Sequence, residues 1–160
     1  MSKESLFEER KTIKQVEEST SFVPKFDEKG LIPVVTTDFE SGEVLMQGYM
    51  NKEAFAQTIR LGEAVYYSRS RKYLWHKGKK SGFKQIIKEI RIDDDQDSVW
   101  LRVNVSGGAS CHVGYRSCFF RSVPFGNNID KSKIILEFKE KKKVFDPKKI
   151  YSNEPNPTKL

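Results

Sequence analysis

The chain has few cysteines, few histidines and no long apolar segment. It contains two cysteines and two histidines among 160 residues. No apolar run approaches the roughly 20 residues that a membrane-spanning helix needs, and the first residues lack the apolar stretch and cleavage site of a signal peptide. We therefore expect a cytoplasmic protein without a membrane partner, whose cysteines bind a metal as thiolates instead of forming a disulfide.

The size and composition predict one globular domain. A chain of 160 residues can bury a core without disulfides, and 37% hydrophobic residues suit a soluble protein. The net charge of +7 raises the question of nucleic acid. However, no nucleic-acid recognition motif is visible, and much of the excess lies between Lys131 and Lys149, as in a solvated tail. A basic site for a phosphorylated small molecule explains the remaining charge equally well, so nucleic acid is the less favoured partner.

Apolar and turn residues predict short strands, over residues 31–37, 43–49, 64–68, 85–92 and 98–105. The first two form a hairpin, and a helix follows between an N-cap at Asn51 and a terminating Gly62. In the fourth strand, we expect Ile86, Ile90 and Ile92 to share one face. The fold class is therefore α+β, mainly antiparallel β with one or two helices.

Both ends of the chain differ in composition from the middle. Residues 1–27 are polar and charged, and we expect at most a short helix there, outside the main core. Beyond Val123 the chain is rich in lysine, and residues 153–160 have the composition of a disordered tail. Neither a repeat nor a linker between two domains is visible.

The loop between the last two predicted strands is strongly acidic. If its backbone is extended, Asp93, Asp95 and Asp97 point to one side and Asp94 to the other. Three converging carboxylates are a plausible Mg²⁺ site, completed by water or a substrate phosphate. An acidic turn without a metal is the alternative, since aspartate favours turns. The loop lacks the glycine and glutamate positions of a calcium-binding hand.

The two cysteines lie close together in the sequence, with a histidine next to the first. Cys111 and Cys118 offer soft ligands for a metal such as zinc, but two thiolates alone do not make a catalytic zinc site. Two buried thiols without chemical function are the alternative, and a lone histidine such as His112 is more often structural. Gly114, between the cysteines, allows the backbone to approach a ligand closely.

Residues 68–82 combine hydroxyls, cations, glycines and aromatic rings. Such a mixture suits a site that grips phosphate and stacks a base. A solvated basic loop would have the same composition, so this segment alone decides nothing. Its role depends on what the fold places beside it.

Short motifs occur in a fixed order: Gly30 to Pro33, Gly42 to Met46, Met50 to Ala54, Ser68 to Arg71, Leu74 to Gly78, Ser81 with Gly82, Asp93 to Asp97, and Cys111 to Phe119. This set resembles the phosphoribosyl-AMP cyclohydrolase family. The resemblance covers residues 28–123, which leaves an N-terminal extension, residues 1–27, and a basic C-terminal extension, residues 124–160.

The resemblance implies an intertwined homodimer that acts in histidine biosynthesis. Such an enzyme hydrolyses the purine ring of phosphoribosyl-AMP between N1 and C6, with one zinc ion per subunit at the dimer interface and with Mg²⁺. It implies zinc ligation by Cys111 and Cys118, and proton transfer to the departing ring nitrogen by His112. The remaining implied roles are magnesium ligation by Asp93, Asp95 and Asp97, and substrate binding by Arg69, Arg71, Trp75, Lys77 and Ser81.

One position departs from the family pattern. The family's acidic motif has a cysteine, its third zinc ligand, where this chain has Asp94. A carboxylate can bind zinc but is a harder ligand than a thiolate. Three outcomes follow from this departure: zinc held by Asp94, Cys111 and Cys118, a different divalent metal in the site, or a changed function. The alternatives are a paralogue that acts on a different purine nucleotide, a non-catalytic metal- or nucleotide-binding protein, and, last, RNA binding through the basic tail.

Overall fold

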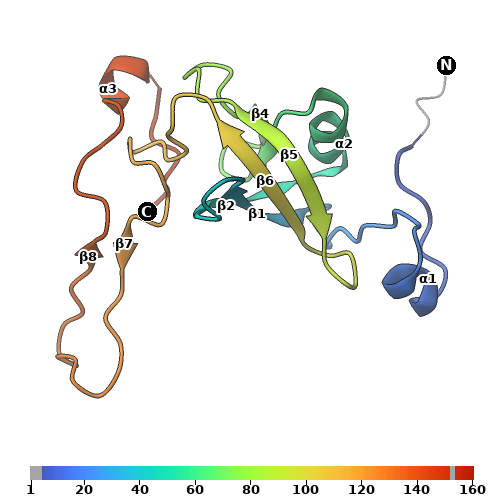
Figure 1. The fold of residues 1–160 in the computed structure, drawn as a ribbon, viewed down its shortest axis with the longest axis horizontal. Helices are drawn as coiled ribbons and strands as arrows, with labels where there is room; N and C mark the ends of the chain where they lie inside the picture. The colour runs from blue at the N-terminus through green and yellow to red at the C-terminus, as the bar shows by residue number, and fades with distance from the viewer. Residues whose placement is uncertain (1–4, 152–153) are drawn as a thin grey trace.

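The computed structural model describes residues 5–151 and 154–160, and a four-stranded sheet lies at its centre (Figure 1). In spatial order its strands are β2 (Val44–Met50), β1 (Ile32–Asp38), β6 (Val99–Val105) and β5 (Gln85–Ile92). The β1–β2 and β5–β6 pairs are antiparallel hairpins, as predicted. β1 also pairs with β6 in parallel, a contact between distant segments that no local pattern indicated. The sheet is therefore mixed, and the α+β class is confirmed.

The predicted helix is present as α2 (Lys52–Leu61). The Asn51 side chain accepts a hydrogen bond from the Ala54 amide at 2.8 Å, and Gly62 ends the helix in the left-handed conformation at φ 67°. The inner face buries Phe55 in the core. Both caps and the apolar spacing were readable from the sequence because each acts within one turn of the chain.

A second, two-stranded sheet pairs β3 (Val65–Ser68) with β4 (Tyr73–His76). β3 was predicted, whereas β4 lies inside the basic and aromatic segment for which no strand was predicted. The pairing places Trp75 opposite Tyr66, whose ring is fully buried. The β3–β4 sheet therefore fixes the aromatic and basic side chains of this segment in place.

The face of β5 that packs on the core differs from the predicted one. Ile87, Ile90 and Ile92 stand opposite buried residues of β6. A register shift follows Ile87, so the period of two is interrupted by a β-bulge. Ile86 is 39% exposed as a result. The prediction that Ile86 shares a face with Ile90 and Ile92 is wrong, because the bulge reverses the alternation between them.

The N-terminal segment, residues 5–27, contains the predicted short helix, α1 (Ile13–Glu18). The prediction that the segment lies outside the core is wrong. Phe7, Phe22 and Phe26 pack against the main core. In Figure 1 the segment runs along the same side of the molecule as the loop between β5 and β6.

The C-terminal chain forms a projecting arm and then returns to the body of the protein (Figure 1). The arm pairs β7 (Arg121–Ser122) with β8 (Glu137–Phe138), and α3 (Pro147–Ile150) follows. Of the stretch predicted to be disordered, residue 153 lies outside the described residues, whereas residues 154–158 line a cavity in the structure. Among the described residues, no helix is long and apolar enough to cross a membrane.

Candidate functional site

A cavity of ≈ 1140 Å³ opens between the β3–β4 sheet, β2, the cysteine loop (residues 110–118) and the C-terminal segment (residues 139–151 and 154–158). Its volume suits a ligand of at least nucleotide size. The structure brings together there most of the side chains that the resemblance implied, namely Arg69, Arg71, Trp75, Lys77, Ser81, His112 and Cys118. Their roles stay predictions, but their common location does not depend on the resemblance.

Aromatic rings orient the cations of this cavity. The Arg69 guanidinium lies 4.0 Å from the ring centroid of Tyr49, and that of Arg71 lies 5.5 Å from the Trp75 ring. Arg71 Nε also donates a hydrogen bond of 3.2 Å to the Ser68 hydroxyl. These groups leave further guanidinium N–H donors for an anionic ligand.

Lys77 is buried, unlike the other cations of the cavity. Its Nζ donates to the Ser110 carbonyl at 2.6 Å and lies 4.6 Å from the Trp75 ring centroid. Burial lowers the pKa of Lys77 to about 8, although the nearby thiols Cys111 and Cys118 act in the opposite direction. The structure therefore places this cation beside the cysteine pair.

The cysteine loop holds its two thiols close together. The Gly114 amide donates to the Cys111 carbonyl at 3.0 Å, and the Cys118 amide donates to the Leu45 carbonyl at 2.7 Å. A hydrogen bond with Cys118 lowers the pKa of Cys111 to about 6, whereas the same contact and burial raise the pKa of Cys118. Near neutral pH the pair therefore holds one proton. Two sulfur ligands suit an ion such as zinc, which would need further ligands from elsewhere.

His112 lines the cavity and has one ring nitrogen without a hydrogen-bond partner among the described residues. This nitrogen, Nε2, is buried. Burial and the nearby charge of Lys77 lower the pKa of His112, so the ring is neutral at pH 7. A buried nitrogen without a partner is costly in a folded protein unless a ligand uses it.

A buried polar chain connects the core to the cysteine loop. The Tyr66 hydroxyl shares a 2.6 Å hydrogen bond with Thr36 Oγ1 and donates one of 2.6 Å to Gln85 Oε1. Gln85 Nε2 in turn donates to the Ser110 hydroxyl at 3.2 Å. Sequence reasoning missed this series of hydrogen bonds, because its residues come from segments far apart in the sequence and none of them belongs to a motif that predicts the contact.

The C-terminal segment closes one side of the cavity, which sequence reasoning also missed. Lys148, Tyr151 and Asn156 line it. The Glu140 carboxylate accepts hydrogen bonds of 2.9 and 3.0 Å from successive amides of the cysteine loop. At Gly114, a Cβ atom would lie 2.5 Å from the Phe145 carbonyl oxygen, so the two segments pack too closely for any larger residue. The lysine-rich composition concealed these contacts.

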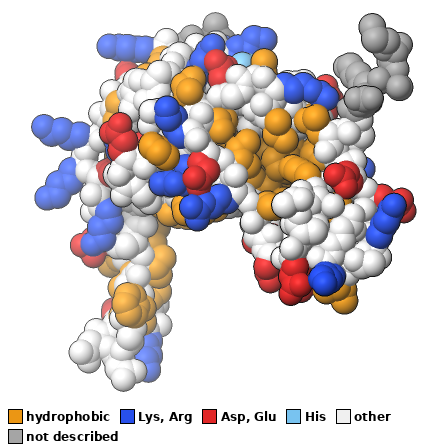
Figure 2. Space-filling model, turned by 45° about the vertical axis from the view of Figure 1, so that its right-hand side comes forward, with side chains coloured by type: hydrophobic (Ala, Val, Ile, Leu, Met, Phe, Trp, Pro, Cys, Tyr) orange, Lys and Arg blue, Asp and Glu red, His pale blue; other side chains and the backbone are white. Residues whose placement is uncertain are grey.

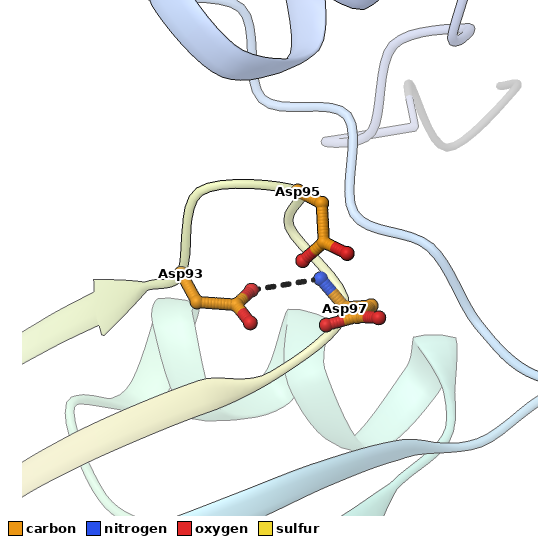
Figure 3. Close-up of side chains that lie close together, drawn as sticks. All are labelled: Asp93, Asp95 and Asp97. Carbon is orange, nitrogen blue, oxygen red and sulfur yellow. Dashed lines mark hydrogen bonds between the residues drawn. The ribbon is translucent and has the colours of Figure 1, made fainter.

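The acidic loop (residues 93–97) brings Asp93, Asp95 and Asp97 together (Figure 3). One ligand atom of each lies within 4.8 Å of the others. Hydrogen bonding with Asp95, together with burial and Asp93, raises the pKa of Asp97 to about 6. The convergence was predicted correctly, but not the extended backbone, because Gln96 turns the loop at φ 57°. Such a carboxylate set fits a hard divalent cation.

The acidic loop and the cysteine loop lie at opposite ends of β6. The acidic loop precedes Val99, whereas the cysteine loop follows Val105 and bonds to Gln85, the residue paired with Val105. A strand of this length separates them by about 20 Å at ~3.3 Å per residue. The structure therefore does not bring exposed Asp94 to the cysteines within one chain.

Comparisons with known proteins concern the chain as a whole. A sequence model of the family described as Phosphoribosyl-AMP cyclohydrolase matches residues 46–120. A relative of that name from Rhodopseudomonas palustris (strain TIE-1) is 49% identical over 136 residues, 85% of this chain and 88% of its own. Another from Sinorhizobium fredii is 47% identical over 88% of this chain and 90% of its own. One from Desulforapulum autotrophicum is 52% identical over 76% of this chain and 91% of its own. The chain belongs to the phosphoribosyl-AMP cyclohydrolase family.

Proposed function

We propose that this protein hydrolyses the purine ring of phosphoribosyl-AMP between N1 and C6, a step of histidine biosynthesis. The relatives' names support the reaction. The observation that carries the proposal is His112, which lines a cavity of cations and aromatic rings and whose buried Nε2 has no partner among the described residues. A purine nucleotide presents a base to such rings and phosphates to such cations.

The cavity has separate features for the two ends of this substrate. Phosphoribosyl-AMP carries one phosphate on each of its two ribose units, so it needs more than one cationic contact. Arg69 and Arg71 stand on the β3–β4 side, and Lys148 stands on the C-terminal side. Trp75 offers a ring for the base. The substrate would therefore span the cavity from one sheet to the C-terminal segment.

His112 moves the proton in the proposed reaction. As water adds to C6, its neutral Nε2 accepts a proton from that water and passes it to N1 while the C6–N1 bond breaks. The lowered pKa of His112 supports this role because it leaves Nε2 free to accept at neutral pH. Atoms balance in the single ring-opened product, since the water oxygen stays on C6 as a carboxamide carbonyl, one water proton goes to N1, and the other goes to the exocyclic nitrogen on C6.

Cys111 and Cys118 would hold the zinc ion, with Asp94 of a second copy as the third ligand. Zinc bound there acts as a Lewis acid that lowers the pKa of its water toward neutrality. The proximity of the two thiols supports the ligand pair. The separation of Asp94 from them within one chain supports a site built from two chains.

Asp93, Asp95 and Asp97 would hold Mg²⁺, which is supported by their close approach. Oxygen ligands alone, partly exposed, suit an ion that keeps several waters. In a dimer that brings the acidic loop to the other subunit's cavity, this ion would lie near the substrate phosphates and offset their charge.

A homodimer is supported by the apolar side chains of the projecting arm, seen in orange at the lower left of Figure 2. Phe119, Val123, Phe125, Ile135 and Phe138, on or beside the arm, are between 53% and 92% exposed. A contiguous apolar surface of this kind marks a protein contact. A second copy that covers it would also explain how a two-stranded arm persists away from the main core.

The test is ring opening of phosphoribosyl-AMP by purified protein that has been stripped of metal and then given Zn²⁺ with Mg²⁺. We expect turnover to return with zinc, and Cys118→Ser to lose both bound zinc and turnover. Binding of the nucleotide without turnover under any divalent metal would refute the reaction and favour a non-catalytic nucleotide-binding protein. Turnover of a different purine nucleotide alone would refute the substrate.

A further inference from the structure

Gln96 of the acidic loop is bound on all sides by the N-terminal segment. The residue is 5% exposed although it lies at the tip of a hairpin. Its Oε1 accepts a hydrogen bond of 2.9 Å from the Val23 amide. Its Nε2 donates to the carbonyls of Val16 at 2.9 Å and Ser21 at 3.1 Å. Every polar atom of this side chain is therefore used by a segment far away in the sequence.

Arg10 links the same two parts through the backbone. Its Nη1 donates to the Val23 carbonyl at 2.7 Å and to the Asp95 carbonyl at 2.9 Å. The Lys25 amide also donates to the Gln96 carbonyl at 2.7 Å. These contacts engage the backbone on both sides of the turn, and none of them occupies the carboxylates of Asp93, Asp95 or Asp97.

The shape that these contacts hold is unfavourable by itself. A non-glycine residue at the positive φ of Gln96 costs on the order of 1 kcal/mol, and three neighbouring carboxylates repel one another. Without the contacts from the N-terminal segment, Gln96 would leave its positive φ and the three carboxylates would move apart. Hydrogen bonds from a charged donor and a buried amide are strong enough to offset costs of this size.

We infer that the N-terminal segment presets the acidic loop for its cation, with Arg10 and Gln96 as positioning residues. This inference rests on the proposed magnesium site and adds a role for the N-terminal segment, which lies outside the region of resemblance. The inference also predicts a change in Mg²⁺ affinity of the opposite sign to the one expected from charge alone. A cation beside the site repels Mg²⁺, so the charge of Arg10 alone weakens binding, whereas its positioning effect strengthens binding.

The experiment is calorimetric titration of the full-length, metal-free protein with Mg²⁺. Arg10→Met should raise the Mg²⁺ dissociation constant about tenfold, the loss expected for one charge-assisted hydrogen bond. Lys14→Met is the matched control, because it removes the same charge from an exposed position of α1 and should change the constant by less than about twofold. An unchanged or lower constant for Arg10→Met would overturn the inference.

Gln96→Gly distinguishes the contribution of the side-chain hydrogen bonds from that of the backbone turn. Glycine adopts the positive φ without strain, so a loop shaped by its backbone alone would keep its affinity. We expect a loss of about tenfold or more instead, with the circular dichroism of the folded protein retained. Retained affinity would overturn the inference. If the wild-type protein binds no Mg²⁺, the magnesium site fails and this inference with it, whereas turnover of phosphoribosyl-AMP tests the reaction separately.

Discussion

At the scale of single residues, the site contains two groups that the fold keeps deprotonated for different physical reasons. The lowered pKa of His112 leaves its ring neutral, and the lowered pKa of Cys111 favours the thiolate. Burial dominates the first shift, and the hydrogen bond with Cys118 dominates the second. The same loop therefore supplies both a base and a thiolate at neutral pH.

Replacement of His112 by asparagine should lower kcat by about 10²- to 10⁴-fold, the usual contribution of a general acid–base group. KM and bound zinc should change little, because the thiols remain. The control is His76→Asn, since the His76 ring is already engaged by Glu63 at 2.6 Å and is not free to transfer a proton. Equal losses in the two variants, measured by steady-state kinetics, would remove His112 from the proton transfer.

Thiolate formation should distinguish the two cysteines. In metal-free protein, we expect one thiolate to form as the pH rises through about 6, the value to which the contact with Cys118 lowers the pKa of Cys111. Because the pKa is lowered, the thiolate is present above this pH and is lost below it. In Cys118→Ala, which removes the hydrogen-bond donor, the midpoint should move upward. Ultraviolet titration of the thiolate measures both, and a midpoint unaffected by the substitution would show that the thiols do not interact.

At the scale of elements, local signals were reliable and signals that needed a partner were not. The caps of α2 and the hairpins of β1–β2 and β5–β6 follow from residues within a few positions of one another. The bulge after Ile87 could not be predicted, because the alternation looks regular in the sequence. The turn at Gln96 could not be predicted either, since the N-terminal segment that holds it is distant in the chain.

The C-terminal segment offers a matched pair for a binding test. Lys148 lines the cavity, whereas Lys149, its neighbour in α3, does not, and both are exposed. We expect Lys148→Met to raise KM for phosphoribosyl-AMP about fivefold, as for one exposed cation–phosphate contact of ~1 kcal/mol. Lys149→Met should leave KM within about twofold. The same KM in both variants would show that α3 contributes only general positive charge.

At the scale of the whole molecule, the candidate site is divided. The segment 68–82 and the cysteines were visible as motifs in the sequence, but the cavity that the fold builds from them was not, because it also needs β2 and the C-terminal segment. One chain carries the cysteine pair at one end of β6 and Asp94 at the other. Under the proposed ligation by Cys111, Cys118 and Asp94, a complete three-ligand site would therefore require two chains, and we propose the exposed apolar arm as the surface through which they associate.

A mixture of two inactive variants tests this arrangement. Asp94→Ala keeps both cysteines and lacks the carboxylate, whereas Cys118→Ser keeps the carboxylate and lacks a thiol. Each alone should bind zinc poorly and show little turnover. When the two are unfolded together and refolded at equal amounts, half of the dimers are mixed, and each mixed dimer has one intact site of two. Activity should therefore recover to about a quarter of the wild-type value.

Activity can recover only if dimers form that contain one chain of each variant. Mixing the folded variants without unfolding is therefore the control. The same two variants mixed without unfolding should recover activity only as fast as dimers exchange subunits. Recovered zinc, measured on the refolded mixture, should follow the recovered turnover. If Asp94→Ala alone retains zinc and turnover, Asp94 is not a ligand. If both variants are inactive and the refolded mixture stays inactive although dimers form, the metal site lies within a single chain, and the role of Asp94 must be sought in its own acidic loop.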